Sequence, residues 1–191
     1  MGKDKWTALL VLGIVLGAGA AFVYGRVAGD SAPGDFEVRT GNYRLEDGLF
    51  DQAIEQFEAA LDKNPEHTGA LLGLGITYLQ MGHLEEAIAR FDRLVSVDPE
   101  MGVAYADRGI AHDRQGEYER ALADYRTALE LDDKLAKGPG WLWRFLRNVP
   151  EPPPTIRDRA DYLEAELAKP EEERLLQLPE KDDEQRMFKI D

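Results

Sequence analysis

The chain has 191 residues, no cysteine, and 37 acidic against 23 basic side chains, which gives a net charge of −14. This length leaves room for one modest domain with extensions. The acidic balance argues against nucleic acid as a partner, because phosphates need a basic surface. The lack of cysteine excludes disulfides, thiolate catalysis, cysteine-containing zinc sites and a lipoprotein anchor.

A transmembrane helix is predicted over residues 6–25, after a short polar flank at 1–5. The 19 residues from Trp6 to Tyr24 carry no charge, and as a helix they would reach roughly 28 Å, close to the ~30 Å hydrocarbon core. The basic flank predicts a cytoplasmic N-terminus and a body on the outer side of the membrane. We therefore expect a single-pass protein of the inner (cytoplasmic) membrane with a periplasmic body.

Small residues recur at every fourth position of this apolar run. They are Gly13, Gly17, Ala21 and Gly25. On a helix they form one smooth stripe, a pattern that favours close packing of membrane helices. The alternative is a signal peptide cut near Ala18 and Ala20, but the apolar run continues to Tyr24, which favours a retained anchor.

Beyond a linker at 26–33, the sequence repeats itself with a period of 34 residues. Three copies cover residues 34–67, 68–101 and 102–133. Gly75 matches Gly109, for example, and Phe91 matches Tyr125. Three copies at one period indicate a tandem array of equivalent structural units.

These copies resemble the tetratricopeptide repeat, a helix–turn–helix unit of the same period. The resemblance implies an all-α solenoid in which recurring glycine and alanine let paired helices approach closely. Two departures stand out: Arg108 takes the place of an expected leucine, and Asp133 takes the place of the proline that closes a repeat. Because of the second departure, we expect the last helix of the array to run on a little.

The resemblance also predicts a concave groove lined by the first helix of each repeat. The implied groove residues are Val38, Asn42, Leu45, Leu72, Ile76, Leu79, Ala106, Ile110, Asp113 and Arg114. The carboxylate clamp of some family members needs lysine and asparagine at several of these positions, and only Asn42 fits. An apolar or amphipathic partner segment is the expected ligand, although the chain's own tail is an alternative cover for Leu72 and Ile76.

The C-terminal third continues the helical pattern. We expect residues 134–149, which include Trp141 and Phe145, to form a capping helix for the array; an interfacial membrane helix is the alternative. Residues 150–191 are read as a proline-rich spacer, a helix over 155–168 and an acidic tail. That helix is predicted either to fold back on the repeats or to dock a partner.

No catalytic, cofactor or metal motif is found. His67, His83 and His112 lack metal-ligand spacing, and no nucleophile or phosphate-loop signature occurs. The sequence therefore predicts a non-catalytic, membrane-anchored adaptor that supports assembly or stability of a bacterial membrane or envelope complex. The alternatives are an integral accessory subunit that makes contact mainly through its membrane helix, and a secreted periplasmic binding protein if the N-terminus is cleaved.

Overall fold

The computed structural model describes residues 32–138 and 154–177, and within these ranges the regular structure is entirely helical. The elements are α2 (Asp35–Glu46), α3 (Phe50–Lys63), α4 (Thr68–Met81), α5 (Leu84–Val97), α6 (Gly102–Gln115), α7 (Tyr118–Leu131), the 3-10 helix η1 (Asp133–Ala136), α9 (Ile156–Leu167) and the 3-10 helix η2 (Glu171–Glu173).

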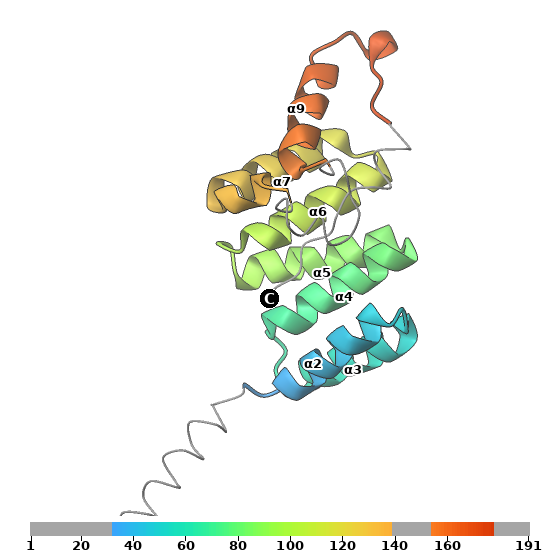
Figure 1. The fold of residues 1–191 in the computed structure, drawn as a ribbon, viewed down its shortest axis with the longest axis vertical. Coiled ribbons are helices and arrows are strands. Elements are labelled where there is room, and N and C mark those ends of the chain that lie inside the picture. The colour runs from blue at the N-terminus through green and yellow to red at the C-terminus, as the bar shows by residue number, and fades with distance from the viewer. Residues whose placement is uncertain (1–31, 139–153, 178–191) are drawn as a thin grey trace, which may run out of the picture.

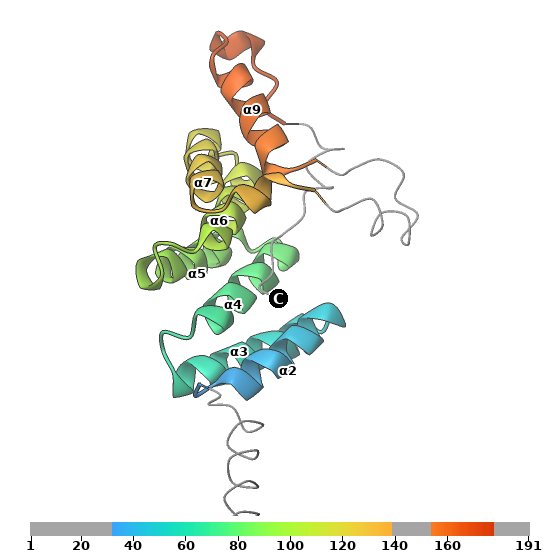
Figure 2. The same ribbon diagram turned by 60° about the vertical axis from the view of Figure 1, so that its left-hand side comes forward.

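The six helices from α2 to α7 form three antiparallel pairs that stack along one direction (Figures 1 and 2). The first helices α2, α4 and α6 contact one another along one side of the stack. The helices α6 and α7 begin 34 residues after α4 and α5. The predicted tetratricopeptide-type solenoid is thus confirmed.

Within each pair, a glycine on the first helix faces an aromatic ring on the second. The pairs are Gly41 with Phe57, Gly75 with Phe91, and Gly109 with Tyr125. A Cβ atom at position 75 would lie only 2.3 Å from the ring of Phe91, and that ring is completely buried. The absence of a side chain on the first helix therefore lets a large ring fill the space between the two helices.

The turn inside each pair is made by a glycine with a left-handed backbone. Gly48, Gly82 and Gly116 have φ angles of 72°, 78° and 84°. At the second turn, the N–H groups of Gly82 and His83 donate to the carbonyl oxygens of Leu79 and Tyr78. Glycine adopts this conformation without the cost that a Cβ would add, so the first helix ends there.

The second helix of each pair ends at an Asn or Asp whose side chain holds the next turn. Asn64, Asp98 and Asp132 each accept a hydrogen bond from the backbone N–H two residues later, at 3.2, 3.2 and 2.9 Å. The expectation that α7 runs on past the usual stop is wrong, because α7 ends at Leu131, 34 residues after the end of α5. The local side-chain hydrogen bond competes with helix continuation even where proline is missing.

The C-terminal helix α9 folds back on the repeats and covers α7. Its start is fixed by a capping box in which Thr155 and Asp158 bond each other's backbone N–H groups. Ile156, Ala160 and Leu163 on its inner side are buried in the common core. The range 139–149 that was predicted to cap the array lies outside the described residues, whereas residues 133–136 form η1.

The predicted membrane helix also lies outside the described residues, and so do its small residues Gly13, Gly17, Ala21 and Gly25. Among residues 32–138 and 154–177, no helix is long and apolar enough to cross a membrane.

Candidate functional site

A groove of about 660 Å³ lies between α2 and α4 on the side where the first helices meet. It is lined by Asp35, Val38, Arg39, Asn42, Leu45, Glu46, His67, Thr68, Gly69, Leu72, Gly73 and Ile76. Val38, Leu45, Leu72 and Ile76 give it apolar walls. Val38 and Leu45 are seven positions apart on α2, and Leu72 and Ile76 are four apart on α4, so each helix turns one apolar stripe toward the groove.

Two glycines on α4 keep the groove open. A Cβ atom on Gly69 would come within 3.3 Å of Val38 across the groove. One on Gly73 would come within 2.3 Å of the ring of Phe57, which fills the space behind it. Side chains at either position would narrow the groove or displace its wall.

Polar groups lie along the α2 side and at one end of the groove. Arg39, Asn42 and Glu46 are exposed on α2. At the end, Nε2 of His67 lies 2.9 Å from Oδ1 of Asp35, and the other oxygen of Asp35 accepts a hydrogen bond from the N–H of Ala32. The His67–Asp35 contact joins the start of α4 to the start of α2 and closes the groove there.

His67 and Asp35 were not predicted as groove residues. The histidine was weighed only as a metal ligand, whereas its ring forms a hydrogen bond between the starts of two helices. The available signal was positional: His67 precedes α4 directly and Asp35 is the first residue of α2, so the starts of two neighbouring first helices are expected to lie close together.

The described lining of this groove ends at Ile76 on α4 and includes no residue of α6. Arg159 of α9 makes two hydrogen bonds of 2.7 Å to the carboxylate of Asp113 on α6, and the hydroxyl of Tyr125 donates to the same carboxylate. Asp113 and Arg159 are both buried, so this ion pair is shielded from water. Asp113, which the sequence assigned to the groove, is thus bound by the chain's own helix α9.

The structure brings together five of the ten groove residues implied by the sequence. Val38, Asn42, Leu45, Leu72 and Ile76 line the groove. The other five do not line it. Leu79, Ala106 and Ile110 are fully buried in the core, Asp113 is bound to Arg159, and Arg114 is exposed and donates a long, 3.4 Å hydrogen bond to the carbonyl oxygen of Leu79.

The polar clusters outside the groove hold neighbouring helices together. Arg108 binds Asp124 through two hydrogen bonds of 2.8 and 2.7 Å and Asp92 through a third of 2.8 Å, so it ties α6 to α7 and α5. Nδ1 of His112 lies 2.7 Å from Glu117. Within the part of the chain that the structure describes, no group of three or more His, Cys, Asp or Glu side chains is placed to hold a metal ion.

Comparison with known proteins agrees with this geometry. Two sequence profiles of the tetratricopeptide repeat match, one over residues 44–107 and one over residues 102–135. No curated protein sequence matches the chain.

Solved structures share the fold at low sequence identity. They include the tetratricopeptide domain of Arabidopsis OM64 (20% identity, TM-score 0.52, covering 53% of this chain and 84% of that one). The second tetratricopeptide domain of Spaghetti (RPAP3) bound to the HSP90 peptide SRMEEVD is similar (24%, 0.51, 52% and 93%), as is MamA (25%, 0.51, 55% and 61%).

Proposed function

Because this chain is a tetratricopeptide repeat protein over residues 44–135, we propose that it is a non-catalytic adaptor whose groove between α2 and α4 holds a segment of a partner protein. The observation that carries the proposal is the groove itself: about 660 Å³, apolar along both walls, and bordered by polar side chains. Such a groove suits a peptide segment that buries one apolar face.

The chemistry of the groove walls limits the kind of peptide that the groove can bind. Val38, Leu45, Leu72 and Ile76 offer aliphatic contacts, and the polar groups combine one arginine with the carboxylates of Asp35 and Glu46. The peptide SRMEEVD held by a structural neighbour is acidic and ends in a carboxylate. This groove lacks the lysines that such a peptide needs, so an amphipathic helix with a mixed-charge border is the better ligand.

The proposed adaptor is held at the inner membrane by the apolar run at 6–25, with the repeats on the periplasmic side. The length of the run, its lack of charge and the basic residues before it support this arrangement. In that position the groove would serve the assembly or stability of a membrane or envelope complex.

A photo-crosslinking amino acid at Asn42, on the groove side of α2, tests the binding site in the full-length protein in its native membranes. A matched probe at the exposed Ala89 on α5 reports random collisions. We expect a defined adduct from position 42 and none of that mass from position 89. The Val38→Lys change, which puts a charge on the apolar wall, should remove the adduct. Equal adducts from both positions, or an adduct indifferent to Val38→Lys, would exclude the groove.

A second experiment tests the anchor. The mass of the protein purified from membranes should correspond to residues 1–191, and alkaline extraction should leave it in the membrane. Loss of about the first 20 residues would instead favour a secreted periplasmic binding protein.

The accessory-subunit alternative is tested by Gly17→Leu combined with Ala21→Leu. If co-purification of partners fails for this pair but survives Val38→Lys, the membrane helix is the main contact and the adaptor proposal is wrong.

A further inference from the structure

The last described residues lie on the side of the stack that carries the groove. Arg159 of α9 donates a 2.9 Å hydrogen bond to the carbonyl oxygen of Leu176, and the same guanidinium group binds Asp113 on α6. Leu176 also packs against the common core. Asp113 lies two repeat periods after Leu45, which is a wall residue of the groove. The chain therefore reaches residue 177 beside the third repeat, at the position that corresponds to the groove wall in the first.

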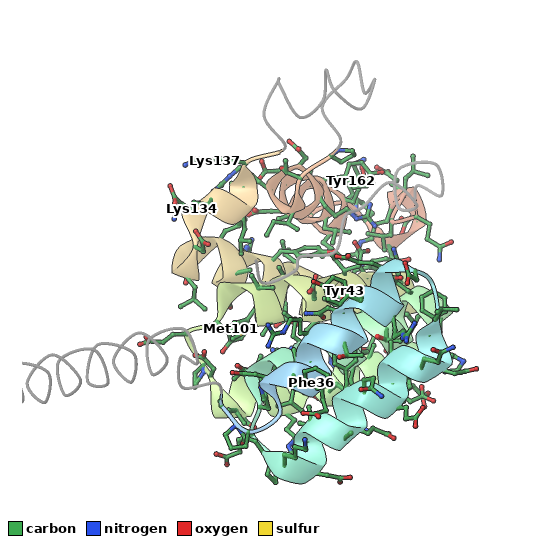
Figure 3. All side chains as sticks on the ribbon, turned by 60° about the horizontal axis from the view of Figure 1, so that its bottom comes forward. Phe36, Tyr43, Met101, Lys134, Lys137 and Tyr162 are labelled. Carbon is green, nitrogen blue, oxygen red and sulfur yellow. The ribbon has the colours of Figure 1, made fainter. Side chains whose placement is uncertain are left out.

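The sequence continues over residues 178–191, which lie outside the described residues. Figure 3 is turned so that the α2 end of the stack comes forward, and it labels Tyr43 on α2 and Tyr162 on the more distant α9. Packed helices lie about 8–10 Å apart, so the path from α6 across α4 to the groove is about 20 Å long. An extended chain covers about 3.3 Å per residue, so residues 178–186 alone reach about 30 Å. The segment is therefore long enough to enter the groove.

The part of the segment that arrives there is apolar. Met187, Phe188 and Ile190 are the apolar residues after Pro179, and only Lys189 separates them. The walls of the groove are aliphatic on both sides, and its volume of about 660 Å³ leaves room for side chains of this size. Removal of these apolar side chains from water is the favourable contribution to docking.

An acidic stretch precedes the apolar residues and matches a basic side chain on the path. Asp182, Asp183 and Glu184 follow one another in the sequence. Arg114 is exposed at the end of α6 and reaches toward α4, where it donates to the carbonyl oxygen of Leu79. Opposite charges at this crossing favour a path over α4 toward the groove rather than away from the repeats.

We propose that residues 186–190 of the chain's own C-terminal segment occupy the groove between α2 and α4 when no partner is bound. Met187, Phe188 and Ile190 then lie against the apolar walls. The inference rests on the proposed function, because the segment acts as an intramolecular competitor that a partner has to displace. Tethering supplies the segment at an effective concentration on the order of millimolar, so even a weak contact keeps the groove occupied.

The lack of cysteine in the chain makes the docking directly testable. In purified full-length protein in detergent, Asn42→Cys with Lys189→Cys places one thiol at the groove and one in the segment. A short bismaleimide should join them within one chain, which is measured as the linked peptide pair recovered from protein of monomer mass. Ala89→Cys with Lys189→Cys, whose first thiol is on the exposed surface of α5, should give at least tenfold less. Equal yields would overturn the proposal, as would a link found only in covalent dimers, which would put the segment of a second copy in the groove.

Single changes on either side of the contact test what holds the segment. Val38→Lys on the groove wall and Phe188→Glu in the segment should each lower the yield of the intrachain link at least fivefold. Asp161→Lys on the exposed side of α9 and Gln185→Glu are the matched controls and should leave the yield within twofold of the parent. A yield that does not respond to Val38→Lys or to Phe188→Glu would show that the segment does not use the apolar walls, and would refute the proposal.

The photo-crosslinking probe at position 42 separates this inference from the proposed function. In native membranes, Phe188→Glu should raise the yield of the partner adduct at least threefold, because the segment no longer competes. An unchanged yield would refute the competition and leave the partner site intact. Absence of an adduct with and without Phe188→Glu would refute the proposed function, and the intrachain link, which needs no partner, would still decide the docking.

Discussion

At the scale of single residues, Asp113 and Arg159 carry the contact that fixes α9 on the repeats. Both are buried, and two 2.7 Å hydrogen bonds join them over 46 positions of sequence. Removing one member of a buried ion pair leaves a charge without its counter-ion in a medium that solvates it poorly.

We therefore expect Arg159→Leu to lower the free energy of unfolding by about 3–5 kcal/mol. The measurement is urea unfolding followed by circular dichroism. Arg159→Leu combined with Asp113→Leu should be much less destabilised than Arg159→Leu alone, because neither member of the pair is then left as a buried charge without its counter-ion. A double variant as unstable as the sum of the single ones would show that the pair does not interact.

Glu166 helps to hold the last described segment against α9, together with Arg159 and Tyr162, which donate to the carbonyl oxygens of Leu176 and Leu175. Its carboxylate accepts hydrogen bonds from Lys169 and from the backbone N–H of Leu175, and the Lys169 ammonium, followed by this N–H, lowers the pKa of Glu166 below its usual 4.5. A carboxyl group whose pKa is lower in the folded state stabilises that state above the unfolded pKa, and this stabilisation is lost as the pH falls through the folded value.

Acidification below about pH 4.5 should accordingly loosen the contact of residues 170–177 with α9. Amide exchange or limited proteolysis of this segment at a series of pH values measures the loosening. Glu166→Gln should show the loosened behaviour already at neutral pH. A segment that is equally protected at pH 3 and pH 7 would contradict the role of this carboxylate.

At the scale of elements, close approach within each helix pair depends on the glycine that faces the aromatic ring. Gly75→Ala adds a methyl group 2.3 Å from the ring of Phe91. Alanine favours the helix by about 1 kcal/mol over glycine, but overpacking of a filled core typically costs about 1–3 kcal/mol.

We expect the overpacking to dominate, so that Gly75→Ala lowers the midpoint of chemical unfolding. Phe91→Leu creates space at the same place, and the double variant should therefore lose less stability than the two single losses added together. If the stability losses of the two single variants simply add up in the double variant, the side chain at position 75 and the ring at position 91 do not interact.

The helices also show which structural features could be predicted from the sequence and which could not. The 34-residue period is sufficient to predict the helix pairs and their stacking, because each glycine and aromatic position has one role in every repeat. In the sequence, Arg108 was noticed only because it replaces the leucine expected at its position in the repeat. Its actual role depends on Asp92 and Asp124, which sit on two other helices, and no single repeat contains that information.

The groove shows the same division. Residues of α2 and α4 that line it follow from the repeat pattern, since both helices belong to regular pairs. On α6, the repeat pattern placed Asp113 in the groove, whereas the structure shows it bound to Arg159, which lies on a helix outside the repeats. Contacts between the periodic and the non-periodic parts of a chain have no signature in the period.

At the scale of the whole molecule, stability runs from neighbour to neighbour along the stack. Each helix contacts chiefly its own pair and the adjacent one, and α9 contacts α7 and η1. In such an array a terminal helix protects the repeat beneath it more than the distant ones.

A chain that ends after residue 138 removes α9 and uncovers α7. Hydrogen exchange should then rise most in α6 and α7, where Leu122 and Tyr125 form part of the core, and least in α2 and α3. A uniform rise across all helices would instead indicate one fully cooperative unit and would contradict the neighbour-to-neighbour description.

The hydrogen bonds at Asn64, Asp98 and Asp132 bear on how such a chain can change its length. Each repeat ends with the same short side-chain-to-backbone link, at the same place in its 34-residue unit. A gene duplication that copies one unit would therefore create a junction of the same kind as those already present between the repeats. Because the link after α7 matches those after α3 and α5, the number of repeats before α9 is the freest variable in this architecture.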